Sequence, residues 1–138
     1  MLTYVGKGYS PAFVDNFDAL ILCLAAGEEV VLVNGPDAIC APLCASEGAC
    51  AHCHGARVRV RDQRAAQELA PLLGRPLCTG SSLRLDRALL ERLRTAYAGG
   101  ALRGGCVGCE WADLCNRVAA TGYEGVRLRM PTTVPEQN

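Results

Sequence analysis

Apolar residues recur every three or four positions in four parts of the chain, the spacing of a helix that buries one face. The first run follows Ser10 and Pro11, a capping residue and a proline suited to the first helical position, and it ends at Gly27. The other runs cover residues 62–73, 86–98 and 110–120. Asp86 is a candidate cap for the third of these helices. This pattern predicts three to four helices.

Short apolar or alternating runs predict strands between these helices. Residues 29–33 form an apolar run that ends at the turn formed by residues 34–37. Residues 57–61 alternate arginine with valine, which predicts a strand whose valines face the core. Residues 83–85 and 126–129 are shorter candidates for strands.

Residues 39–55 show no periodicity and consist mainly of cysteine, glycine, proline, alanine and histidine. A loop with so few core residues needs another organiser, and its cysteines are suited to a metal ion or a cluster. We therefore expect an α+β fold: a single small domain over residues 1–130 with three to four helices, a few short strands and this cysteine-rich loop. We expect residues 131–138 to form a flexible tail.

Charge and hydropathy exclude several classes of function. The 14 basic and 14 acidic residues cancel, so no surplus of charge favours nucleic acid or an anionic membrane. Arg57, Arg59 and Arg61 would share one face of the predicted strand, which a solvated surface explains equally well. No apolar run approaches the ~18 residues of a membrane span, and the N-terminal residues lack a signal-peptide pattern. We expect a cytoplasmic protein with no nucleic-acid or membrane partner.

Nine cysteines among 138 residues are the main chemical feature of the chain. An odd number cannot pair completely as disulfides, and clustered cysteines in a reducing compartment more often bind metal or carry chemistry. The sharpest motif is C-x2-C-x5-C, formed by Cys106, Cys109 and Cys115. Its first pair lies on a glycine-rich turn before a helix whose N-terminus favours thiolates. We expect these three to bind an iron–sulfur cluster, shielded from water by Trp111.

A second array has four cysteines within fourteen residues. Its members are Cys40, Cys44, Cys50 and Cys53. These thiolates could close a tetrahedral zinc site or supply a fourth ligand to the C-terminal array. His52 and His54 lie among them, either as ligands or as loop residues that form hydrogen bonds. Two cysteines stand apart: Cys23 on the first predicted helix, where a core role is favoured, and Cys78 in a loop.

Spacing alone does not decide between zinc and iron–sulfur, because thiolate sites suit both. The C-terminal array has three cysteines, apolar neighbours and no histidine, and these features favour a cluster. The C-x3-C-x2-C signature of radical S-adenosylmethionine enzymes is not met, since Glu47 stands where the third cysteine is required. A nuclease of the RecB-like kind would need a second lysine, and Lys7 is the only one.

Three segments together resemble the bacterial and archaeal family called domain of unknown function 1284. They are the Gly-Lys-Gly-Tyr-Ser-Pro-x-Phe segment at residues 6–13, the turn at residues 34–40 and the cysteine motif at residues 106–115. The resemblance covers nearly the whole chain. It implies a small cytosolic cysteine-rich protein that is suspected of binding an iron–sulfur cluster, with no established reaction.

The resemblance also bears on the ligands. It matches Cys40 and the three C-terminal cysteines, and it leaves the other loop cysteines in a variable region. Members of this family usually carry an Arg-x-His-His-Leu-Leu-Cys segment just before the first motif, and that segment is not found here. If its cysteine is a ligand, this chain lacks a tenth cysteine and its site is incomplete.

We therefore expect an iron–sulfur protein with a redox, sensing or structural role and a possible redox partner protein. The alternative is a zinc-stabilised structural or interaction module without catalysis, held by the loop cysteines. A thiol enzyme that uses Cys53 with His52 or His54 is a third class, for which no orienting third group is evident. No residue is singled out as catalytic.

Overall fold

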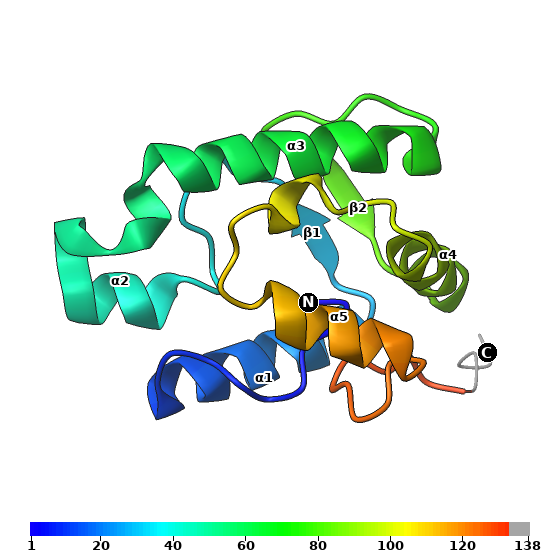
Figure 1. The fold of residues 1–138 in the computed structure, drawn as a ribbon, viewed down its shortest axis with the longest axis horizontal. Coiled ribbons are helices and arrows are strands. Elements are labelled where there is room, and N and C mark those ends of the chain that lie inside the picture. Colours follow the sequence, from blue (N-terminus) through cyan, green and yellow to red (C-terminus); the bar gives the residue numbers. More distant parts are fainter. Residues whose placement is uncertain (133–138) are drawn as a thin grey trace.

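A computed structural model describes residues 1–132 and shows five α-helices, three short 3-10 helices and one two-stranded sheet in that part of the chain (Figure 1). In chain order the elements are α1 (Pro11–Ala25), β1 (Glu29–Val31), α2 (Ala41–Glu47), η1 (Gly48–Cys50), η2 (His52–His54), α3 (Ala56–Leu73), β2 (Ser82–Arg84), α4 (Arg87–Ala98), η3 (Gly104–Cys106) and α5 (Ala112–Ala120). The fold is α+β as predicted, with more helices than the expected three to four.

The two strands are antiparallel, and Val30 of β1 lies opposite Leu83 of β2. In Figure 1, α3 crosses the top of the molecule, α1 and α5 lie at the bottom, and the sheet lies between them. Packing joins α3 to η3, α1 to α2, and α4 to α5. The cysteine-rich segment between α1 and α3 contacts both helices, α1 through α2 and α3 through η2.

Local signals place the ends of several helices where the sequence predicts them. The Ser10 hydroxyl accepts a hydrogen bond from the Phe13 amide at 3.1 Å, and Asp86 caps α4 by accepting from the Leu89 amide at 2.7 Å. Gly74 ends α3 with a φ of +67°, a left-handed conformation that glycine adopts without a steric penalty.

The strand predicted at residues 57–61 is wrong, because this segment is the first part of α3. Five alternating residues also fit a helix that is covered on only one side, and arginine has a high helix propensity. None of the α3 residues is fully buried, and Val60 is 44% exposed. The valines therefore do not form the buried face that the strand prediction required.

Two further predictions need correction. Residues 126–129 form no strand, since the only backbone hydrogen bond from this segment to another is donated by Arg127 to Tyr4 within the described residues. Residues 39–55, predicted as a loop, contain α2, η1 and η2. Their apolar residues are too few to show a helical period. The tail predicted over residues 131–138 lies outside the described residues from residue 133 onward.

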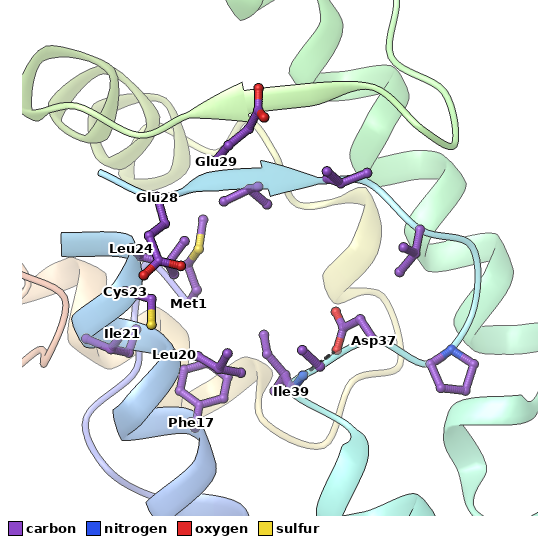
Figure 2. Close-up of a pocket in the computed structure, with 15 residues that line it drawn as sticks. Met1, Phe17, Leu20, Ile21, Cys23, Leu24, Glu28, Glu29, Asp37 and Ile39 are labelled. Atoms are coloured by element: carbon purple, nitrogen blue, oxygen red, sulfur yellow. Dashed lines mark hydrogen bonds between the residues drawn. The ribbon is translucent and has the colours of Figure 1, made fainter. Parts of the chain in front are cut away.

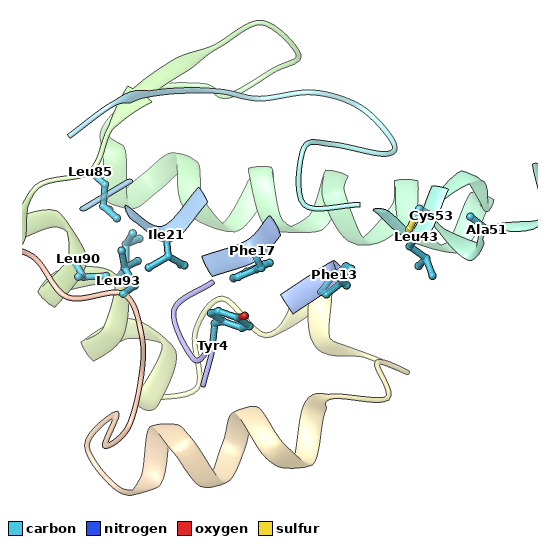
Figure 3. Close-up of a cluster of buried hydrophobic side chains, with 11 residues drawn as sticks. Tyr4, Phe13, Phe17, Ile21, Leu43, Ala51, Cys53, Leu85, Leu90 and Leu93 are labelled. Carbon is cyan, nitrogen blue, oxygen red and sulfur yellow. The ribbon is translucent and has the colours of Figure 1, made fainter. Parts of the chain in front are cut away.

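The hydrophobic core runs along α1 and reaches the cysteine-rich segment. Figure 3 shows Leu43, Ala51 and Cys53 gathered at one end of the row of core side chains. Near its middle, the rings of Tyr4 and Phe17 lie 3.9 Å apart. Cysteine thus belongs to the core at one end of the molecule. Of the helices in residues 1–132, none combines the length and apolar character needed to cross a membrane.

Leu128 is completely buried, so its truncation tests this core. We expect Leu128→Ala to lower the free energy of unfolding by about 2–5 kcal/mol, because it removes buried methyl groups and leaves a cavity. The matched control is Leu22→Ala, whose side chain is 72% exposed and should change stability little. Urea denaturation of both variants measures the difference, and equal stabilities would contradict the assignment of Leu128 to the core.

Candidate functional site

Three of the loop cysteines converge at one end of the core. Cys40 immediately precedes α2 and Cys44 lies four residues later, so both side chains lie on one face of this helix. Cys53, from η2, is only 4% exposed. Cys40 and Cys44 are partly buried and pack against the core cluster to which Cys53 belongs. The segment from α2 to η2 therefore folds back so that the three cysteines lie at the same end of the core.

Burial changes the acidity of these thiols. It raises the pKa of Cys40 to about 12. It also raises the pKa of Cys44, and the neighbouring Cys53 raises the pKa of Cys44 further. The Asp37 carboxylate accepts hydrogen bonds from the amides of Ile39 and Cys40 at 2.9 and 3.2 Å and so holds the turn before α2. Without a metal ion, Cys40 and Cys44 are neutral thiols at pH 7.

Cys106 and Cys115 form a second group around Tyr97 at the end of α4. The Tyr97 hydroxyl lies 3.6 Å from the Cys106 sulfur, and the Thr3 hydroxyl donates a hydrogen bond of 3.1 Å to the Cys115 sulfur. Burial raises the pKa of Tyr97 above its ordinary value, and the nearby Cys106 and Cys115 act in the same direction. The guanidinium of Arg103 stacks 3.7 Å from the centre of the Tyr97 ring.

Cys109 faces different neighbours from these two cysteines. It lines a groove of about 500 Å³ together with Tyr9 and His52. Its backbone still forms the predicted turn, since the Cys109 amide donates to the Cys106 carbonyl at 3.0 Å. The C-x2-C-x5-C motif is therefore compact in its backbone but divided in its side-chain environment.

Tyr9 joins three distant parts of the chain. Its hydroxyl donates to a Glu110 carboxylate oxygen at 2.7 Å, accepts from the Trp111 indole N–H at 3.0 Å and lies 3.4 Å from His52 Nε2. Partial burial and the Glu110 carboxylate raise the pKa of Tyr9 to about 12. Trp111 also lines a smaller hollow, of about 270 Å³, with Cys115. The expected position of Trp111 beside the C-terminal cysteines is consistent with this hollow.

The family comparison covers both groups of thiols. A family model described as a protein of unknown function, DUF1284, matches residues 8–115. The chain belongs to the DUF1284 family. No curated protein and no solved structure matches it. The matched range extends from the segment that contains Tyr9 to Cys115, so every candidate cysteine ligand lies within the DUF1284 domain.

The DUF1284 structure thus brings together some predicted ligands and separates others. Cys40, Cys44 and Cys53 lie at one end of the core, and Cys106 and Cys115 flank one tyrosine, whereas Cys109 has a separate environment. As the side chains stand, no three His, Cys, Asp or Glu residues in the described part of the chain could hold a metal ion. The predicted ligand Cys50 has a side chain outside the described residues.

Two cysteines outside the arrays have ordinary surroundings. Cys23 lines an apolar groove of about 510 Å³ between α1 and β1, shown in Figure 2, where the neighbouring Glu28 raises the pKa of its thiol. Cys78 is exposed, with its sulfur 3.5 Å from the Ser81 hydroxyl. Neither joins the described cysteines of the two groups.

The sequence did not reveal Thr3, Tyr9 or Tyr97 as neighbours of the candidate ligands. Tyr97 fits the apolar spacing of α4, so the sequence predicts only a core role for it. Thr3 lies 112 positions from Cys115 in the sequence, and no local pattern could relate them.

The raised pKa values of the tyrosines give a testable pH dependence. All four tyrosines have a raised pKa, which is about 12 for Tyr4 and Tyr9. Each phenol therefore keeps its proton more tightly in the folded chain than in the unfolded chain, whose tyrosines titrate near about 10. The folded state should lose stability as the pH rises from about 10 to about 12.

Absorbance of the phenolate in the near ultraviolet measures this directly. We expect little ionisation of the native protein at about pH 10 and a normal curve in denaturant. Tyr9→Phe should remove one of the late ionisations. A native titration that coincides with the denatured one would contradict the burial of these phenols.

Proposed function

We propose that this DUF1284 protein is a thiolate metalloprotein, and that Cys40, Cys44 and Cys53 are the central ligands of an iron–sulfur cluster. The observation that carries this proposal is the packing of Cys40 and Cys44 against the core cluster that contains the buried Cys53, whose thiol also raises the pKa of both. Thiolates are the usual ligands of such clusters. Metal binding would remove the thiol protons and join these sulfurs through bonds to the metal.

The surroundings of the three thiols support a stabilising metal. The segment from α2 to η2 contributes few fully buried side chains to the core, among them Leu43, Ala51 and Cys53. Its one α-helix has seven residues, which is too short to be stable without tertiary contacts. Bonds from its cysteines to a metal would therefore contribute directly to folding. Cys50, three residues before Cys53, is the nearest candidate for a fourth ligand in the sequence.

The second group of thiols, which is separate from these three ligands, has hydroxyl groups beside its sulfurs. The Thr3 hydroxyl donates a hydrogen bond to the Cys115 sulfur, and the Tyr97 hydroxyl lies close to the Cys106 sulfur. Hydrogen bonds to sulfur are one of the means by which proteins adjust the reduction potential of a cluster. The two groups together contain five described thiols, one more than a single four-coordinate zinc ion would use, which favours a cluster. When bound, a cluster would supply one-electron transfer, redox sensing or structural support.

Zinc is a second candidate, because the loop thiols are close together. Sulfurs that lie about 2.3 Å from one zinc ion at tetrahedral angles are about 3.8 Å from each other, and the loop cysteines lie within one fourteen-residue segment at the same end of the core. Cys53 is also nearly inaccessible, and a closed site is typical of structural zinc. This second form would make the protein a zinc-stabilised module without catalysis.

Anaerobic purification followed by iron, sulfide and zinc analysis tests the proposal. We expect a brown protein with bound iron and sulfide, and Cys53→Ala should lose both and become less stable. The control is Cys78→Ala, because Cys78 is exposed and lies outside both groups of thiols. A colourless protein with stoichiometric zinc would favour the second candidate. A metal-free wild-type protein with the same stability as Cys53→Ala would refute both.

A second pair of variants asks which group of thiols carries the metal. We expect Cys40→Ala to lose the metal and Cys109→Ala to keep it, because Cys109 faces Tyr9 and His52 instead of the other candidate ligands. Metal content and the visible absorption spectrum measure both variants. If Cys109→Ala loses the metal and Cys40→Ala retains it, the C-terminal motif is the site and the loop assignment is wrong.

A further inference from the structure

The groove that contains Cys109 has a charge pattern that the proposed metal site does not use. It lies between the start of α3 and the turn at residues 108–110, and its volume is about 500 Å³. Arg57 and Arg61, one helical turn apart on α3, both line it. Tyr9 and His52 complete its wall.

The two guanidinium groups converge on Gly108. A Cβ atom at this glycine would lie 3.3 Å from Arg57 Nη2 and 3.6 Å from Arg61 Nη2. Arg61 Nη2 also donates a hydrogen bond to the Gly108 carbonyl at 2.5 Å. Two positive side chains are therefore held beside the same backbone turn, although their charges repel each other.

No carboxylate neutralises this pair within ion-pairing distance in the described part of the chain. The salt bridge found in residues 1–132 joins Arg127 to Asp18, remote from the groove in sequence. Glu110 lines the groove, but its carboxylate accepts the hydrogen bond from Tyr9 and forms no ion pair with either arginine. The groove thus has two guanidinium groups without a protein counterion.

We propose that this groove binds a small molecule that carries a phosphate group, with Arg57 and Arg61 as its main contacts. Guanidinium groups bind phosphate through two parallel charge-assisted hydrogen bonds, and an anion between them would relieve their mutual repulsion. The N-terminal end of α3 adds a field of the same sign. The volume exceeds that of a phosphate alone, so an organic group has room beside His52 and Val58.

A small ligand fits the charge distribution better than a nucleic acid. The chain has no net charge, whereas nucleic-acid binding needs an extended basic surface. Arg59, which the strand prediction placed beside Arg57 and Arg61, lines a different hollow with Val33 and Cys78. The helical conformation of α3 therefore leaves only two of the three arginines at the groove.

Titration with inorganic pyrophosphate at constant ionic strength tests this site, with binding measured by calorimetry on the full chain. We expect Arg57→Gln to weaken binding about tenfold or more, because it removes a charge-assisted contact. Arg59→Gln is the matched control, since it removes the same charge from the same helix outside the groove. Equal losses in the two variants, or no binding by the wild-type protein, would overturn the proposal.

Alkylation of Cys109 provides an independent measurement. Because Cys109 lines the groove, pyrophosphate should slow its reaction with iodoacetamide, while the exposed Cys78 should react at an unchanged rate. Mass spectrometry of the digested protein reads both positions at once. Equal effects at the two cysteines would overturn the site. Arg57→Gln should leave metal content unchanged, so failure here is distinguishable from failure of the metal proposal.

Discussion

The contact of Cys40 and Cys44 with Cys53 is the constraint on which the functional regions of this protein depend. This contact closes the segment between α1 and α3, which has few other core residues. Cys53 lies in η2, and this short helix leads through Gly55 directly into α3. The position of the thiols thus helps to set where α3 begins, and with it the wall of the groove that contains Arg57 and Arg61. A metal centre at the thiols would stabilise both regions.

Tyr9 provides the second link between these regions. Its hydroxyl contacts Glu110 and Trp111 near the C-terminal cysteines and His52 beside the loop cysteines. Its ring also packs edge-on against that of Phe13 in α1. One side chain near the start of the DUF1284 domain therefore connects the cysteine-rich segment to the turn that carries Cys109. The two proposed sites are linked through Tyr9, and they use different residues to bind their ligands.

The arginine–valine alternation at residues 57–61 shows where a sequence pattern misleads. Alternation over five residues fits an amphipathic strand, but a strand also needs a neighbour to pair with, and β1 and β2 pair only with each other in the described chain. Residues 126–129 fail as a strand for the same reason, although Val126 and Leu128 are buried. Burial at alternate positions reflects which neighbours a segment has, and the sequence does not specify these neighbours.

By itself, the sequence determined the features that depend on nearby residues: the caps at Ser10 and Asp86, the α+β class and the grouping of cysteines in two arrays. Hydrogen bonds over three or four positions are encoded locally, so they could be predicted. Only the tertiary structure decided that Cys53 meets Cys40 and Cys44, that Cys109 faces Tyr9, and that two arginines share a groove. The first relation depends on how one short segment folds back on itself, and the other two depend on how segments distant in sequence pack across the core.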